Sequence, residues 1–391
     1  MPKDGRLYLK KVGISMNKRK KLKMGATIEG VGWNYMGWRH PAMPANASEN
    51  IDYYVEQAKI AEAAKFDTLF LIDVSHVGPG NIPHYLSMFE GVSIMSALSM
   101  VTTNIGLSAT IATSYGDPFT AARQILSLDK ISKGRASLNA ITSNAGGMVN
   151  YSRGHLTQSD LYPMQKEFME IVLGLWDTYE DDAFIRDKAR GIYFNPNKMH
   201  TLNYRGEYFS VDGPLNLSRS VQGRPVLFTA GTSSNFMENA AKYTDAALIL
   251  GESLNSTKKI AKELKSRVAL EGRSTEDFII AVLQTPLVGR TEEEAEEKYR
   301  EMESLIPLYR IQKPLFFGSA EKVADQIQEW YEAGAMDMLL VRQEHPTGLK
   351  DFVDLVVPIL QDRGIFRTEY ESNTLRGNLE LPYPVNGYVK I

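Results

Sequence analysis

The chain has 391 residues, of which 43% are hydrophobic and 23% are charged, and its formal net charge at pH 7 is -3. This balance points to neither a nucleic-acid nor a membrane partner, and the hydrophobic fraction suffices for a large buried core. The absence of cysteine excludes disulfides, a thiolate nucleophile and cysteine metal ligands. No apolar run near the N-terminus is long enough for a signal peptide or a membrane span, so we expect a cytoplasmic protein.

The N-terminal region is basic, and we expect residues 1–22 to form a solvated tail. Its charges lack the interleaved aromatic side chains that are typical of nucleic-acid binding. The remaining residues, 23–391, contain no repeat and no low-complexity linker. We expect them to form a single domain with an insertion at about 181–223, in which Arg205–Val211 has the pattern of a hairpin strand.

Strand-like and helix-like segments alternate from residue 23 onward. The predicted strands cover residues 24–29, 68–72, 105–111, 136–142, 226–228, 246–250, 278–288 and 338–341. The predicted helices cover residues 51–65, 86–100, 118–131, 162–177, 236–243, 257–270, 292–302, 320–333 and 349–362. The apolar run Leu315–Phe317 is assigned to no element.

The predicted strands are largely apolar, without polar alternation, as in parallel sheets that are covered on both faces. Nearly all of them are followed by a helix. The pattern therefore predicts an α/β protein built as a (β/α)₈ TIM barrel with loop insertions, with a doubly wound sheet as the alternative.

The segment Arg224–Asn235 passes from a strand, through Gly231, Thr232 and Ser233, into a helix. The glycine permits close approach of the backbone, and the hydroxyls and the free N–H groups of the first helical turn converge on one point. Such a turn can hold a phosphate group. Since Ser and Thr are also preferred helix caps, simple capping is an equally good interpretation of the spacing.

Other polar residues occur at predicted strand ends, where barrel enzymes carry their working residues. Asp73 either caps a loop or contacts a ligand, and Asn139 either makes a hydrogen bond inside the barrel or faces a ligand. Thr110 ends the third strand in the same way. The six histidines show no zinc-binding spacing, so no metal site is expected. No dinucleotide fingerprint follows the first strand, and a flat, phosphorylated cofactor suits these features.

Many short stretches are similar to those of a known family. They are Trp38–Pro41, Lys65–Asp73, Ser127–Asp129, Gly134–Ala136, Gly174–Asp177, Arg205–Phe209, Gly213–Asn216, Gln222–Pro225, Val356–Pro358 and Thr374–Arg376. Together they resemble the bacterial-luciferase superfamily, and within it the two-component FMN-dependent monooxygenases. That group includes nitrilotriacetate, EDTA and dibenzothiophene-sulfone monooxygenases and pristinamycin synthase subunits. The resemblance covers nearly the whole chain from about residue 38.

The resemblance implies a luciferase-type barrel that takes reduced FMN from a separate NAD(P)H:flavin reductase. With O2, such an enzyme oxidises a small organic substrate, often cleaving a C–N or C–S bond. It also implies a homo-oligomer, either a dimer or a tetramer. Matched position by position, Asp73, Thr110, Tyr162 and the turn Gly231–Ser233 correspond to flavin-contacting residues, and Asn139 corresponds to an asparagine near the flavin.

The chain also departs from the family pattern. Gln158 stands where the family has a histidine, four residues before Tyr162, and is a further candidate for cofactor contact, with His155 as a nearby substitute. Gly32-Trp33-Asn34 replaces Gly-His-His, and Leu138 replaces a tryptophan. No catalytic residue is assigned. Two alternatives follow: an oxidoreductase that uses a deazaflavin or transfers hydride without inserting oxygen, and a catalytically silent flavin-binding barrel.

Overall fold

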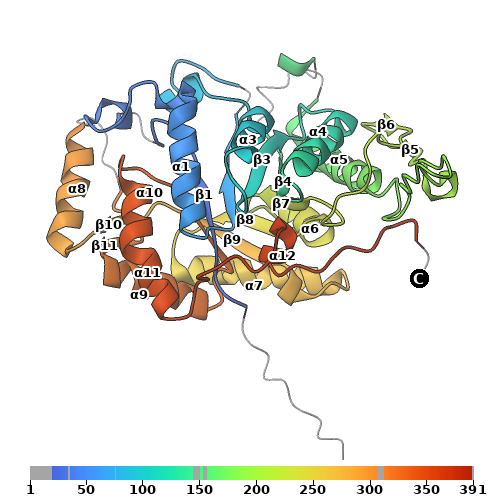
Figure 1. The fold of residues 1–391 in the computed structure, drawn as a ribbon. Helices are drawn as coiled ribbons and strands as arrows, with labels where there is room; N and C mark the ends of the chain where they lie inside the picture. Colours follow the sequence, from blue (N-terminus) through green and yellow to red (C-terminus); the bar gives the residue numbers. More distant parts are fainter. Residues whose placement is uncertain are drawn as a thin grey trace, which may run out of the picture.

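The computed structural model describes residues 20–33, 36–74, 76–143, 150–152, 156–305 and 312–389. Parallel strands close a barrel in the order β1-β12-β9-β8-β7-β4-β3-β2 (Figure 1). Their bounds are β1 Lys23–Thr27, β2 Thr68–Phe70, β3 Gly106–Ala112, β4 Ala136–Ile141, β7 Val226–Ala230, β8 Ala246–Leu250, β9 Ile279–Gln284 and β12 Met338–Val341. The predicted (β/α)₈ barrel is confirmed, and the doubly wound alternative is wrong.

Helices surround the barrel (Figure 1). The longer ones are α1 Ile51–Ala63, α3 Gly91–Ser99, α4 Pro118–Ile131, α5 Leu161–Trp176, α6 Ser234–Tyr243, α7 Leu254–Leu270, α8 Glu292–Leu305 and α9 Ala320–Glu332. The shorter ones are α2 Pro83–Leu86, α10 Gly348–Asp351, α11 Val357–Asp362 and α12 Leu375–Asn378, with a π-helical turn at Phe352–Val356. One-turn 3-10 helices lie at Gly37–Arg39, Ala47–Glu49, Gln158–Asp160, Pro196–Lys198 and Thr275–Asp277.

Side-chain caps set several of these boundaries. Asp117 accepts a hydrogen bond from the Thr120 N–H, so α4 begins at Pro118 as predicted. The predicted helix over 86–100 is wrong at its start. The Glu90 carboxylate accepts hydrogen bonds from the N–H groups of Val92 and Ser93, and this cap makes α3 begin at Gly91.

The predicted strand over 278–288 is two separate strands. Only β9 belongs to the barrel, whereas β10, Leu287–Gly289, pairs in parallel with β11, Phe317–Ser319. The Leu287 N–H donates to the Phe316 carbonyl at 3.0 Å, so the previously unassigned apolar run enters this small sheet. A local pattern could not reveal this, because the two strands are separated in sequence by α8.

The barrel interior is filled by apolar side chains of its strands, including Phe70 and Phe228, whose rings meet edge-on with centroids 5.6 Å apart. The segment around α12 contributes Leu375 and Leu379 to the same cluster. A Cβ on Gly106, at the start of β3, would lie 2.5 Å from Leu375 Cδ1, so only glycine fits there. The N-terminal end of the barrel is therefore closed by the C-terminal region of the chain.

The insertion after α5 lies at the opposite end of the molecule from α8 (Figure 1). It contains a hairpin of β5, Tyr204–Arg205, and β6, Ser210–Val211, in agreement with the predicted hairpin. The buried guanidinium of Arg219 ties it down through ion pairs to Asp177 at 3.1 Å and Asp181 at 2.8 Å.

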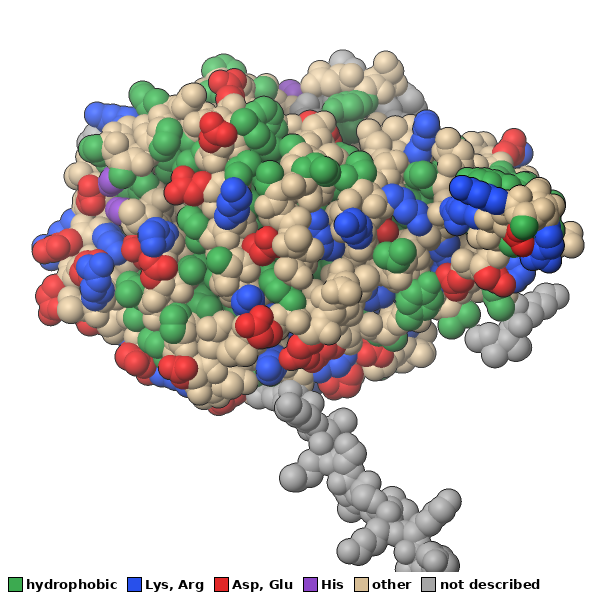
Figure 2. Space-filling model, viewed as in Figure 1, with side chains coloured by type: hydrophobic (Ala, Val, Ile, Leu, Met, Phe, Trp, Pro, Cys, Tyr) green, Lys and Arg blue, Asp and Glu red, His purple; other side chains and the backbone are tan. Residues whose placement is uncertain are grey.

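Acidic and basic side chains are interspersed over the face shown in Figure 2. At the start of the described chain, the Lys20 ammonium forms an ion pair with Asp277 at 3.1 Å, and Leu22 is buried. Residues 1–19 of the expected tail lie outside the described residues. In the part of the chain that the structure describes, no helix is both long and apolar enough to cross a membrane.

Candidate active site

The structure brings Asp73, Thr110 and Asn139 to neighbouring positions at the C-terminal ends of β2, β3 and β4. The Asn139 amide donates to the Thr110 hydroxyl at 3.0 Å, and that hydroxyl donates to the Leu71 carbonyl at 2.5 Å. The Asn139 Oδ1 atom is buried without a hydrogen-bond partner. Asn139 therefore makes a hydrogen bond inside the barrel, as one interpretation of the sequence predicted. Its side-chain oxygen remains free to accept a hydrogen bond from a ligand.

Asp73 both caps a helix and lines a cavity. Its Oδ2 atom accepts a hydrogen bond of 3.0 Å from the Gly91 N–H at the start of α3. It also borders a cavity of about 120 Å³ together with Thr110 and Tyr115. Burial raises the pKa of Asp73 to about 6, against the effect of the Gly91 hydrogen bond. The carboxyl group therefore changes protonation close to neutral pH.

The residues of the predicted phosphate seat, Gly231, Thr232, Ser233 and Tyr162, lie at the N-terminus of α6. Ser233 is the N-cap of α6, because its Oγ accepts a hydrogen bond of 3.2 Å from the Phe236 N–H. The same hydroxyl donates to the Tyr162 hydroxyl at 2.8 Å. Capping is thus present, and it leaves two hydroxyls and the N-terminus of α6 at one place, as an anion would require.

Two features keep this turn open. Gly231 has a φ of +152°, and a Cβ there would lie 3.0 Å from the Phe236 ring, so a side chain would be strained and crowded. Thr232 and Ser233 are both exposed to solvent. A diffusing phosphate group can therefore reach the hydroxyls without displacing the packed core.

Gln158 lies apart from these hydrogen bonds. It is exposed and begins the 3-10 helix that precedes α5. His155 and Asn34 lie outside the described residues.

Two further strand-end residues, which follow β1 and β12, were missed in the sequence. Glu29 lies just after β1 and is buried, with both carboxyl oxygens lacking a hydrogen-bond partner. Burial raises its pKa to about 7, and the Arg342 guanidinium just after β12 opposes this rise. Both are charged residues that directly follow an apolar strand, so the rule that selected Asp73 would also have found them.

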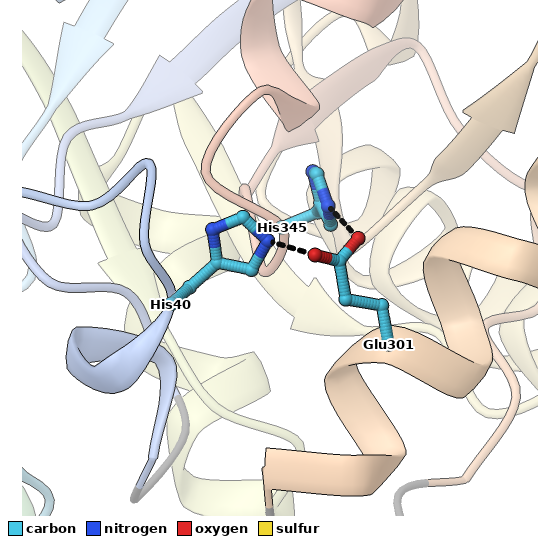
Figure 3. A group of neighbouring side chains, drawn as sticks. All are labelled: His40, Glu301 and His345. Carbon is cyan, nitrogen blue, oxygen red and sulfur yellow. Dashed lines mark hydrogen bonds and ion pairs between the residues drawn. The ribbon is translucent and has the colours of Figure 1, made fainter.

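A second cluster joins three segments that are distant in sequence. Figure 3 shows the Glu301 carboxylate of α8 between the imidazoles of His40 and His345. Its Oε1 lies 2.7 Å from His40 Nε2, and its Oε2 lies 3.5 Å from His345 Nε2. This spacing can be that of metal ligands or of a hydrogen-bonded clamp.

The ring nitrogens on the far side of this cluster distinguish the two possibilities. His40 Nδ1 accepts from the Ala42 N–H at 3.0 Å, and His345 Nδ1 accepts from the Thr347 N–H at 3.2 Å. A neutral ring that accepts at Nδ1 carries its proton at Nε2. The His40 Nε2–H group then donates to the Glu301 carboxylate, which favours a clamp between these two residues. His345 Nδ1 also lies 2.8 Å from the Thr347 hydroxyl, and its Nε2 has no hydrogen-bond partner among the described residues.

These residues define a (β/α)₈-barrel enzyme whose polar groups gather at the C-terminal rim, where this class of protein carries its active site. The family model for luciferase-like monooxygenases matches residues 34–315, and the chain belongs to this family.

Several known proteins are similar over nearly their whole length. N-acetyl-S-(2-succino)cysteine monooxygenase of Bacillus subtilis (strain 168) is 38% identical, with 96% of this chain and 100% of the relative covered. Nitrilotriacetate monooxygenase component A of Aminobacter aminovorans is 32% identical, with the same shares covered. The crystal structure of a riboflavin lyase with modified FMN and riboflavin has a TM-score of 0.84 at 27% identity, covering 92% of this chain and 96% of that chain. The predicted family is confirmed.

Proposed function

We propose that this protein is the oxygenating component of a two-component FMN-dependent monooxygenase. It receives reduced FMN from a separate NAD(P)H:flavin reductase and uses O2 to oxidise a small organic substrate. The observation that carries this proposal is the hydroxyl pair of Ser233 and Tyr162, which lies 2.8 Å apart at the N-terminus of α6. Family membership supports flavin as the ligand, and the relative that is named as component A supports a partner protein.

The residues present fit FMN. Thr232, Ser233 and Tyr162 would hold the phosphate through their hydroxyls, together with the first N–H groups of α6. The unpartnered Oδ1 of Asn139 would accept a hydrogen bond from the ring system, near Thr110 and Asp73. When bound, reduced FMN supplies the electrons that activate O2.

The protein's own residues then orient the substrate and move protons. Asp73 borders a cavity at the strand ends, and its pKa of about 6 suits it to exchange a proton near neutrality. The names of the two relatives specify a thioether and a tertiary amine as substrates. These names support oxidation beside a C–S or C–N bond in this chain's substrate.

Anaerobic titration and oxygen uptake together test this function. Reduced FMN should bind more tightly than oxidised FMN, and FAD should bind poorly, since the rim offers one phosphate seat. With a flavin reductase and NADH present, O2 consumption should rise when a substrate is added and should match the product formed. Preference for a deazaflavin, or turnover without O2, would favour hydride transfer instead. Flavin binding without any product from a broad screen of thioethers and amines would favour the silent barrel.

We also propose that the protein forms a homo-oligomer, a dimer or a tetramer. Sedimentation velocity over a range of protein concentrations measures this directly. A single monomeric species at all concentrations would contradict it.

A further inference from the structure

The C-terminal rim carries polar groups on two opposite arcs of the barrel. Thr110 and Asn139 belong to β3 and β4, whereas Arg342 directly follows β12. In the strand order β1-β12-β9-β8-β7-β4-β3-β2, the strands β12 and β4 lie across the barrel from each other. The candidate phosphate seat lies after β7, between these arcs but next to β4. Arg342 therefore lies across the barrel from Asn139, whereas Asp73 follows β2, which pairs with β1 on the nearer side.

The Arg342 guanidinium is fixed in place by neutral groups, and the carboxyl groups of Glu29 and Glu344 lie near enough to interact with it electrostatically. Its central carbon lies 4.3 Å from the centroid of the Trp33 ring, and Trp33 meets Tyr85 edge-on with ring centroids 5.5 Å apart. The Arg342 Nε donates to the Thr285 hydroxyl at 3.3 Å. Among the described residues, no carboxylate oxygen lies within the 4.0 Å of an ion pair with Arg342. The terminal N–H groups of a fixed, half-buried guanidinium remain available to a ligand.

The groups around Arg342 are also without partners. The Tyr85 hydroxyl and both oxygens of Glu29 are buried and form no hydrogen bond in the structure. Buried polar groups usually have partners, because leaving one unpaired costs about 1–3 kcal/mol. Several unpaired groups beside a free guanidinium point to a ligand that completes their hydrogen bonds.

We propose that Arg342, with the Tyr85 hydroxyl as a second donor, binds a carboxylate of the substrate, so that the molecule oxidised is a small organic acid. This rests on the proposed function, and it names the substrate class of the same site. A guanidinium binds a carboxylate through two parallel N–H···O bonds, and stacking on an aromatic ring pre-orients it. Trp33 at the same time offers an apolar surface to the hydrocarbon part of the substrate.

Trp33 also gives a reason for a departure from the family pattern. A tryptophan occupies the position where histidine was expected after the first strand. Tryptophan has the strongest cation–π interaction of the aromatic side chains. The substitution therefore supplies the surface that holds Arg342 at the rim.

The experiment measures binding without turnover. Benzylsuccinate and its uncharged diamide are titrated calorimetrically into the full-length parent, Arg342→Gln and Arg342→Lys. The parent should bind the acid at least tenfold more tightly than the diamide. Arg342→Gln should lower the affinity for the acid at least tenfold, about 1.4 kcal/mol, and leave the affinity for the diamide unchanged. Arg342→Lys should fall in between, because it keeps the charge but loses the two-point geometry.

Two controls keep the result specific. Arg186→Gln removes another arginine that lies over an aromatic ring, 4.9 Å from the centroid of Phe184, but in the insertion. It should bind both probes like the parent. Anaerobic titration of Arg342→Gln with reduced FMN should give the parent's affinity, which also shows that the variant is folded.

Equal affinity of the parent for acid and diamide would overturn the proposal. The proposal would also be overturned if Arg342→Gln lost affinity equally for the acid and the diamide. A loss of reduced FMN affinity as large as the loss of acid affinity would overturn it as well, because it would assign Arg342 to the cofactor phosphate. The proposed function fails by a different observation, the absence of substrate-dependent O2 consumption. Either conclusion can therefore fail without the other.

Discussion

The Ser233 hydroxyl donates a hydrogen bond of 2.8 Å to the Tyr162 hydroxyl, while its oxygen accepts the Phe236 N–H of α6. One side chain thus caps a helix and belongs to an exposed group of hydroxyls. Capping and phosphate binding make opposite predictions for a negative charge at this position, so they can be separated.

The substitution Ser233→Asp should leave stability close to that of the parent, since Asp caps as well as Ser. It places a negative charge against a phosphate dianion. We expect the affinity for reduced FMN to fall at least about tenfold, or about 1.4 kcal/mol, and the affinity for riboflavin to fall much less. Anaerobic titrations of parent and variant with both ligands measure this. Equal losses for FMN and riboflavin would place the phosphate elsewhere.

The substitution Asp73→Asn keeps an acceptor for the Gly91 N–H but removes the charge. We expect reduced FMN to bind about tenfold more weakly in the variant, at about 1.4 kcal/mol, with the fold intact. Asp117→Asn, which alters the cap of the neighbouring α4, is the matched control and should bind FMN normally. If Asp73→Asn has the same dissociation constant for reduced FMN as the parent, Asp73 caps the helix and does not contact the flavin.

Asp73 also predicts a dependence of stability on pH. Its pKa in the folded protein, about 6, lies above the unfolded value near 3.8. Its contribution to stability is therefore complete below pH 3.8 and is lost as the pH rises through about 6. Asp73→Asn should accordingly gain thermal stability relative to the parent at pH 8 but not at pH 4.

The substitution Glu29→Gln should stabilise the protein at alkaline pH. Burial raises the Glu29 pKa from 4.5 to about 7, so the folded state resists ionisation and loses stability as the pH rises from 4.5 through 7. The shift corresponds to at most about 3 kcal/mol of unfolding free energy above pH 7. Urea unfolding at pH 4.5 and pH 8 measures it. The exposed Glu238→Gln is the control, and a gain that is the same at both pH values would contradict the prediction.

The cluster of Glu301, His40 and His345 should act as a clamp without a metal ion. Co2+ titration should show no saturable visible absorption, because the Nε2–H group of His40 already donates to the Glu301 carboxylate. Glu301→Gln should lower stability by about 1 kcal/mol, since an amide oxygen is a weaker acceptor for the His40 Nε2–H group than a carboxylate. Glu297→Gln, at an exposed position of the same helix, is the matched control. Stoichiometric Co2+ binding that is lost in Glu301→Gln would instead establish a metal site.

The cluster should also make the stability depend on pH in the acidic range. Burial, and next the neighbouring His40, lower the pKa of His345 below its ordinary value of 6.5. The stabilising effect of the neutral ring is present above pH 6.5 and is lost as the pH falls through the lower folded pKa. Glu301 raises the His345 pKa, so its removal makes protonation of the buried ring costlier. The difference in unfolding free energy between parent and Glu301→Gln should therefore grow as the pH falls below 6.5.

Local signals in the sequence predicted the barrel strands and most of their helices. Periodicity identified the apolar strands, and residues such as Asp117 and Ser233 identified helix starts, because capping depends on neighbours three residues apart. The same signals identified Asp73, which ends an apolar strand, and Asn139, which is a polar residue inside one. They also carried the family resemblance, which was confirmed.

Tertiary structure alone decided which of these residues meet. Trp33 and Arg342 lie more than three hundred positions apart in the chain, and only the pairing of β1 with β12 places them together. The pairing of β10 with β11 and the α12 segment that closes the barrel are likewise long-range contacts. Such contacts are stabilised by burial and hydrogen bonding that exist only after the barrel closes, so no short window of sequence contains them.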